Sequence, residues 1–217
     1  MSPAAGAAGF VRPARAGDAG DLARVQVASW LSCLCGIVPS SLLAELTSDE
    51  AFAVWRDRWR DAITSPPTSR HRVLVAVSGD PGAREVVGFV SLGPATDADR
   101  WPGTDAEIYE FRVSPDRAGQ GDDSRLLHAA ADTLAGDGFG TVSIWVPEAD
   151  AVLRRFLESA GWAADGARAE MDVGTSVPVV RLHTAISESL GSFPWLMLGN
   201  GWRGRAPGPF RRPSYRC

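Results

Sequence analysis

The stretch FRVSPDRAGQGDDSRLLHAAADTLAGDGF, residues 111–139, decides how the chain is expected to fold. An apolar run leads through a turn with two glycines into a segment of helical apolar spacing, which stops at Gly136 and Gly138. Such a strand–turn–helix unit can hold a phosphate through its backbone N–H groups and the positive end of the helix. Asp122 and Asp123 stand where that anion would lie, so the stretch also raises the question of how the two acids are accommodated.

The segments on either side extend the pattern. Asp18 or Asp21 opens the first expected helix, and Ser48 or Asp49 opens the second. Apolar, β-branched runs predict strands at residues 10–15, 72–79, 85–94, 106–115, 141–148, 168–173 and 177–186. Helical spacing predicts helices at residues 16–34, 48–63, 123–139 and 149–162. The order β-α-α-β-β-β-α-β-α-β-β indicates an α/β or α+β domain, a mixed sheet covered by helices.

Length and composition fit one domain with a core, since the chain has 217 residues, of which 45% are hydrophobic. We expect a flexible segment at 1–9, the domain at 10–186, and a flexible Gly/Pro/Arg-rich extension at 187–217. No apolar run is long enough for a membrane span, and no secretory signal precedes the domain, so we expect a cytoplasmic protein without membrane contact. The three cysteines form neither a disulfide framework nor a metal site.

The net charge limits the kinds of partner that the protein is expected to bind. The formal net charge is −4, and because the extension is basic, residues 1–186 carry −8. An acidic body disfavours nucleic acid and favours cationic small molecules or basic peptides.

Four features together resemble the GNAT superfamily of acetyl-CoA-dependent N-acetyltransferases over residues 10–186. They are ASWLSCLCGIVP, AEIYEFRVSP with the glycine turn, SRLLHAAADTLAGDGF and EADAVLRRFLESAGW. The resemblance implies a mixed, mostly antiparallel sheet of about six to seven strands flanked by about four helices. It also implies acetyl-CoA as acyl donor, no metal, and a primary amine as acceptor.

The resemblance places the cofactor on the strand and turn. The family's pyrophosphate signature, Gln/Arg-x-x-Gly-x-Gly/Ala, falls on residues 118–123, where Gly121 matches and Ala118 and Asp123 depart. The asparagine that contacts the pantetheine arm in relatives corresponds to Asp150. The implied cofactor-binding residues are Phe111, Arg112, Val113, Arg117, Ala118, Gly119, Gln120, Gly121, Asp122, Asp123, Ser124 and Asp150.

Two interpretations of the paired aspartates stay open. They can face outward and cap the helix by accepting hydrogen bonds from the N–H groups of Arg125 or Leu126. Alternatively, they oppose the pyrophosphate and weaken cofactor affinity about ten- to a hundredfold. Arg117 and Arg125 can offset part of that repulsion.

The resemblance makes Glu107 the candidate general base, acting through water, with Tyr109 as a substitute acid because the usual tyrosine position is Leu157. Strand alternation predicts that Glu107, Tyr109 and Phe111 share one face. Glu110, on the other face, is a second candidate base or a partner of Arg112.

The acceptor pocket of relatives is walled by the segment that contains Trp30, Ile37 and Pro39. We expect the acceptor to be a polyamine, an amino-sugar compound, or a protein N-terminus or lysine, and a homodimer is compatible with the sequence. The rival hypothesis is a catalytically silent GNAT-fold module that binds a ligand or partner. It is favoured by the departures at Ala118, Asp123, Asp150 and Leu157.

Overall fold

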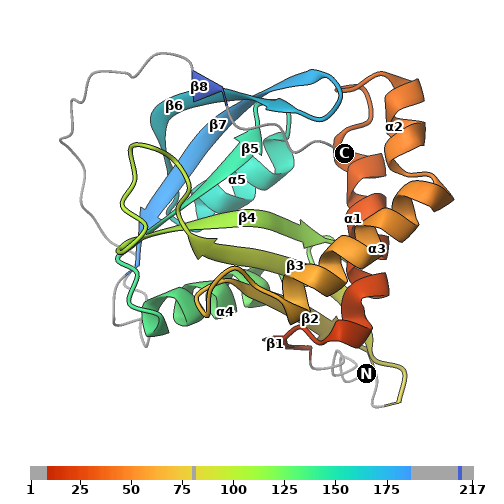
Figure 1. Cartoon of the computed structure of the whole chain (residues 1–217), viewed down its shortest axis with the longest axis horizontal. Helices are drawn as coiled ribbons and strands as arrows, with labels where there is room; N and C mark the ends of the chain where they lie inside the picture. Colours follow the sequence, from red (N-terminus) through yellow and green to blue (C-terminus); the bar gives the residue numbers. More distant parts are fainter. Residues whose placement is uncertain (1–8, 80–81, 187–209, 212–217) are drawn as a thin grey trace, which may run out of the picture.

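The computed structural model describes residues 9–79, 82–186 and 210–211 (Figure 1). Its strands are β1 (Phe10–Pro13), β2 (Arg72–Ser78), β3 (Glu85–Pro94), β4 (Asp105–Val113), β5 (Thr141–Pro147), β6 (Ala163–Asp172), β7 (Ser176–Ala185) and β8 (Phe210–Arg211). Its α-helices are α1 (Ala19–Cys33), α2 (Ser40–Leu46), α3 (Asp49–Thr64), α4 (Asp122–Gly136) and α5 (Ala151–Ser159). Single turns of 3₁₀ helix, η1 (Ala16–Asp18) and η2 (Pro115–Arg117), precede α1 and α4.

The strands form one sheet in the order β1-β2-β3-β4-β5-β7-β6-β8. Neighbours run antiparallel except β4 with β5 and the two-residue β8 with β6, which are parallel. The mixed, mostly antiparallel sheet predicted from the sequence is therefore confirmed. The two segments that are expected to be flexible, residues 1–9 and 187–217, lie almost wholly outside the described residues.

Helices cover both faces of the sheet (Figure 1). On one face, α1 and α3 bury an apolar cluster with β2 and β3 that includes Leu22, Trp59 and Phe89. On the other face, α4 and α5 pack on the central strands through a larger cluster that includes Leu126 and Leu157. This two-sided burial explains why the central strands read as nearly continuous apolar runs.

The helix α3 follows directly from its sequence. The Ser48 side chain accepts a hydrogen bond from the Ala51 N–H at 3.1 Å, as an N-cap should. The predicted stripe of Phe52, Trp55, Trp59 and Ile63 packs against α1 and the sheet. The short helix α2 was not predicted, because its seven residues are too few for a clear period.

The sheet divides in its middle. β4 and β5 pair only from Asp105 with Thr141 to Ile108 with Ile144. A register shift follows in β4, where Ile108 opposes Leu92, Glu110 opposes Ser91, and Tyr109 is the extra residue between them. This is a β-bulge, which bends a strand and increases its twist. Beyond it, β4 and β5 diverge (Figure 1).

Candidate active site

The gap between the diverging halves of β4 and β5 presents backbone donors. The Ser114 N–H donates to the Val87 carbonyl at 2.8 Å, so it points toward β3. Because N–H groups alternate between the two edges of a strand, those of Phe111 and Val113 point away from β3 and toward the gap. The Val113 carbonyl shares this direction and accepts a hydrogen bond from the Ser29 hydroxyl of α1 at 3.3 Å.

The glycine turn lies where this part of β4 ends. Gly119 and Gly121 have φ values of +73° and +81°, a backbone conformation that favours glycine. Gly121 is the residue before the first turn of α4. Among the described residues, apart from the chain neighbours of each glycine, no atom lies within 4 Å of a Cβ built on either one, so the turn is open on that side.

Asp122 turns inward. Its side chain is fully buried, and its Oδ2 accepts hydrogen bonds from Arg117 Nε at 3.2 Å and Nη2 at 3.1 Å. Its Oδ1 accepts from Arg125 Nη2, and Arg117 Nη2 also donates to the Ser78 hydroxyl at 2.6 Å. The predicted cap on the Arg125 or Leu126 N–H is not formed by this residue, because two guanidinium groups outcompete a neutral N–H for the carboxylate.

Asp123 stays at the helix start. It is half-buried, and its Oδ1 accepts a hydrogen bond from the N–H of the next residue, Ser124, at 2.8 Å. The expected cap on the Arg125 or Leu126 N–H is not formed by this residue either, because Asp123 lies within the first turn of α4, whose N-cap residue, Gly121, has no side-chain cap hydrogen bond. Together, the two aspartates are matched by the charges of Arg117 and Arg125, whose side chains stay 24% and 39% exposed.

The start of α5 lies across the gap. Asp150 is its N-cap, and the Asp150 carboxylate accepts from the Leu153 N–H at 3.0 Å. Phe156 stacks on Phe111 of β4, with 5.9 Å between ring centroids. Leu157 is completely buried in the core, so this position serves packing.

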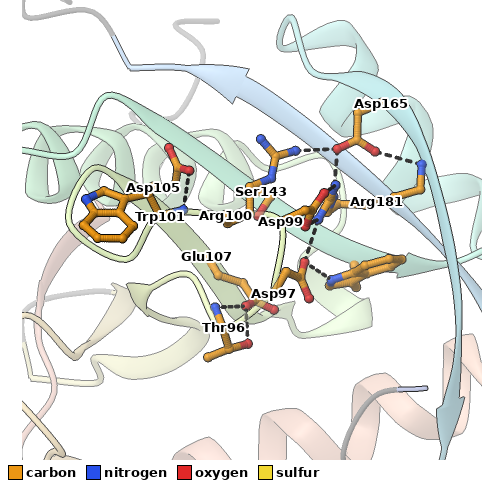
Figure 2. A network of polar contacts seen from close by, with 12 residues as sticks. Thr96, Asp97, Asp99, Arg100, Trp101, Asp105, Glu107, Ser143, Asp165 and Arg181 are labelled. Atoms are coloured by element: carbon orange, nitrogen blue, oxygen red, sulfur yellow. Dashed lines mark hydrogen bonds and ion pairs between the residues drawn. The ribbon is translucent and has the colours of Figure 1, made fainter. Parts of the chain in front are cut away.

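Glu107 lies on β4 just before the bulge, and only 1% of its surface is exposed. Its Oε2 accepts two hydrogen bonds from Thr96, from the N–H at 3.2 Å and from the hydroxyl at 2.8 Å (Figure 2). Its cross-strand neighbour on β5 is Ser143. A buried carboxylate with polar contacts on the central strand is chemically able to accept a proton.

The bulge overturns the predicted alternation of side chains. Phe111 packs in the α4–α5 cluster with Ile108, on the face opposite Glu107, because the extra residue at Tyr109 reverses the pattern. Glu110 consequently lies on the same face as Glu107. It accepts a hydrogen bond from Arg112 Nε at 3.0 Å, which confirms the pairing considered from the sequence.

Charge is concentrated around Arg112. Burial alone would lower the pKa of Arg112, but the negative charge of Glu110, with Cys33 and Asp150 adding to it, raises the pKa above its ordinary value. Arg112 therefore stays protonated beside the gap. Its guanidinium interacts electrostatically with Cys33 at the end of α1 and with Asp150 at the start of α5.

Tyr109 points along the same face as Glu107 toward β3. Its hydroxyl donates to the Pro94 carbonyl at 2.6 Å, and its ring stacks on His71 with 6.0 Å between centroids. Burial lowers the pKa of His71 below its ordinary value, which favours the neutral imidazole. Tyr109 stays a candidate general acid because it lies two residues from Glu107 along β4.

The three predicted acceptor-side residues lie around α1 and α2. Trp30 packs edge-on against Trp55 of α3, with 5.0 Å between centroids. Trp30 and Ile37 also join an apolar cluster with the β6–β7 hairpin that includes Val177. Pro39 is exposed immediately before α2.

Sequence reasoning missed the polar network beside Glu107. The ten-residue segment between β3 and β4, residues 95–104, is tied to Arg181 of β7 (Figure 2). The Arg181 guanidinium binds three carboxylates, those of Asp97, Asp99 and Asp165. The signal was present: a lone arginine inside the apolar run VPVVRLH requires buried anionic partners.

Among the described residues, no cluster of His, Cys, Asp and Glu could hold a metal ion. No helix in this part of the chain is long and apolar enough to cross a membrane.

A mixed sheet that opens between two parallel strands, with N–H groups in the opening and a glycine turn at its edge, suits a protein that binds a phosphate-bearing acyl donor. Residues 41–162 match the sequence model of the Acetyltransferase (GNAT) family. The uncharacterized N-acetyltransferase YuaI of Bacillus subtilis (strain 168) is 32% identical over 138 residues, which cover 64% of this chain and 71% of YuaI. The chain belongs to the GNAT acetyltransferase family and is an acyltransferase.

Solved structures of N-acetyltransferases share the fold of this chain. The PaiA N-acetyltransferase from Thermoplasma acidophilum, solved with coenzyme A, aligns with a TM-score of 0.61 at 16% identity, covering 80% of this chain and 98% of its own. The ribosomal-protein-S18-alanine N-acetyltransferase from Escherichia coli aligns with a TM-score of 0.53 at 16% identity, covering 87% and 100%.

Proposed function

We propose that this acyltransferase uses acetyl-CoA to acetylate a primary amine of a cationic small molecule or peptide. One observation carries the proposal. β4 leaves β5 after Ile108, so the Phe111 and Val113 N–H groups face a gap that ends at the open glycine turn. A strand edge whose N–H groups face a gap suits the pantetheine arm and thioester, and the turn suits a pyrophosphate.

The turn fits an anion despite its aspartates. Asp122 is buried between two arginines, and Asp123 is bonded to the Ser124 N–H. Arg117 and Arg125 retain exposed surface that can reach a phosphate, and their positive charges balance the two carboxylates. We infer that residues 117–124 bind the pyrophosphate, with Asp150 beside the pantetheine arm.

Acetyl-CoA, when bound, supplies an acetyl group activated as a thioester. Glu107 is the proposed base, and since 1% of its surface is exposed, it accepts the amine proton through a water molecule. The Phe111 N–H is proposed to stabilise negative charge on the thioester oxygen. The amine nitrogen attacks the thioester carbonyl, the C–S bond breaks, and coenzyme A leaves as its thiolate, which either departs as the anion or is protonated by water or Tyr109, because the residue at position 157 is a buried leucine without a proton to donate.

The acceptor is inferred from charge. Residues 1–186 carry a net charge of −8, and Glu107, Glu110 and Asp150 all lie on or beside the gap. An acidic setting attracts a protonated amine such as a polyamine, an amino sugar, or a protein N-terminus or lysine. Trp30, Ile37 and Pro39 are proposed to wall the acceptor pocket.

The first experiment is a calorimetric titration of the wild-type protein with acetyl-CoA at moderate salt. We expect a dissociation constant in the micromolar range, about −8 kcal/mol. Spermidine, kanamycin and an alanine-initiated peptide would then be assayed for acetylation. The absence of acetyl-CoA binding up to millimolar concentration contradicts the proposal.

A further inference from the structure

The segment between β3 and β4 covers the proposed base. Residues 95–104 fold back over the face of β4 that carries Glu107, and Thr96 donates two hydrogen bonds to its carboxylate (Figure 2). These bonds fix one oxygen of Glu107. The orientation of the Glu107 carboxylate therefore depends in part on where Thr96 is held.

Thr96 itself is exposed, but the next residue is anchored from the other half of the sheet. Arg181 Nη1 donates to Asp97 Oδ2 at 2.9 Å, and Trp145 Nε1 of β5 donates to the same oxygen at 2.8 Å. Arg181 also holds Asp99 with two hydrogen bonds, of 2.7 and 2.6 Å. A two-pronged arginine–carboxylate pair fixes orientation as well as distance.

Two further contacts join Arg181 and the covering segment through one shared carboxylate, that of Asp165. Arg181 Nε donates to Asp165 of β6 at 2.7 Å, and Arg100, from the covering segment, binds the same carboxylate oxygen. The segment is thus tied to β6 and β7 through Asp97, Asp99 and Arg100. With 5% of its side chain exposed, Arg181 is the buried centre of these contacts.

The chemistry of Arg181 suits this role. Burial alone would lower its pKa, but the hydrogen bonds with Asp99 and Asp97, with Asp165 adding to them, raise the pKa above its ordinary value. The guanidinium stays charged at every accessible pH. Its planar fork can serve several carboxylates at once, which a lysine ammonium cannot match.

We propose that Arg181 is a positioning residue for Glu107, acting through Asp97 and Thr96. The inference rests on the proposed function of Glu107 as base. When Arg181 is removed, the covering segment loses its anchor, and Thr96 no longer holds the carboxylate in one orientation. Misplacement of a base slows the proton transfer without removing the cofactor site.

The test begins with hydrogen exchange of the Thr96 amide, measured by NMR on the intact protein. Arg181→Met should accelerate exchange by about tenfold or more, since the amide loses its fixed acceptor. Asp99→Ala is a gentler second variant, because Asp99 is half exposed and its loss leaves Arg181 paired with Asp97 and Asp165. Arg12→Met, which removes the similarly two-pronged pair with Asp18, is the matched control and should leave Thr96 unchanged.

The second readout is steady-state acetylation with acetyl-CoA and the best amine of the panel. Arg181→Met should lower kcat about ten- to a hundredfold with little change in the KM for acetyl-CoA. The same substitution in a Glu107→Gln background should cost almost nothing, because two residues that act through one contact are not additive. Arg12→Met should keep the wild-type kcat.

Unchanged Thr96 exchange in both Arg181→Met and Asp99→Ala would overturn the inference. Equal loss of kcat in the wild-type and Glu107→Gln backgrounds would also overturn it, since that pattern indicates general destabilisation. A full rate in Glu107→Gln alone instead contradicts the proposed base, and the positioning role falls with it. The rate of Glu107→Gln and the exchange of the Thr96 amide are separate measurements, so failure of the proposed base is distinguished from failure of the positioning role.

Discussion

Asp122 and Arg117 form a buried ion pair at the start of α4, with Oδ2 of the acid 3.2 Å from Nε and 3.1 Å from Nη2 of the arginine. Asp122 follows the one matching glycine of the signature, Gly121, and falls on a position where the signature allows any residue. Because its charge is directed into the protein and matched there, the pair supports the turn. The nearby Arg125 shares the same carboxylate.

Arg117→Ala should therefore destabilise the protein. It leaves Asp122 fully buried with one guanidinium partner fewer, at a cost of about 1–3 kcal/mol after allowance for the partial exposure of Arg117. Thermal unfolding should show a Tm lower by roughly 2–10 °C. Arg24→Ala, which breaks the exposed pair with Asp21, serves as control and should shift the Tm by about 2 °C or less. Equal shifts in the two variants would contradict the importance of the buried pair.

Asp123→Gly should tighten acetyl-CoA binding by about ten- to a hundredfold. The substitution removes a negative charge and frees the Ser124 N–H, now bonded to the Asp123 side chain, for the pyrophosphate. Calorimetric titration measures the change. Asp132→Ala, which removes an exposed acid further along α4, should alter affinity by no more than about twofold. Identical affinity in wild type and Asp123→Gly would argue against an anion site at this turn.

Glu107→Gln should lower kcat by about 10²- to 10⁴-fold, the usual contribution of a general base. The amide side chain is isosteric, so it preserves the Thr96 hydroxyl contact and the acetyl-CoA dissociation constant. Steady-state rates and calorimetry on the same preparation separate the two effects. Glu110→Gln is the comparison for the second candidate base. A larger loss of kcat there than in Glu107→Gln would transfer the role to Glu110.

Acid should weaken the fold through Asp18. Its pKa is lowered by the hydrogen bond with Arg12, despite the opposing effect of burial, and the Arg15 N–H adds to the effect. The unfolded chain then binds a proton more readily, so this stabilisation is fully present above the unfolded pKa of about 3.9 and is lost as pH falls through the lower folded pKa.

We expect Asp18→Asn to be less stable than wild type at pH 7 by about 1–2 kcal/mol, and the difference to decrease as the pH falls through the folded pKa of Asp18. Urea unfolding at several pH values measures it. A difference that stays constant with pH would mean that the contribution of Asp18 does not depend on its charge.

Much of the fold could be predicted from the sequence. The period of α3 with its Ser48 cap, the apolar runs of β2 and β3, and the glycine turn before α4 are local patterns whose physical causes lie within a few neighbouring residues. The family resemblance added the mixed sheet, which local patterns alone do not specify. The short helix α2 escaped because it depends on packing against α1 and the β6–β7 hairpin.

The candidate site was predicted less completely. Glu107 and the residues of the turn stay predictions, but the predicted face of Phe111 was wrong because one extra residue, Tyr109, shifts the register of β4 against β3. No local pattern in AEIYEFRV announces that bulge. The role of Arg181 was not predicted, although an arginine inside an apolar strand requires partners. Two of these partners, Asp97 and Asp99, lie more than 80 residues away in the chain.

By itself, the sequence determined which segments become strands and helices, and where the chain turns on glycine, because these depend on side-chain period and on backbone conformations that glycine favours. Only the tertiary structure decided where the charged groups point. Asp122 turns inward because Arg117 and Arg125 converge on it, and Glu107 is covered because Arg181 draws residues 95–104 across the sheet. A buried charge takes the direction of its partners, and these are brought together only by the fold.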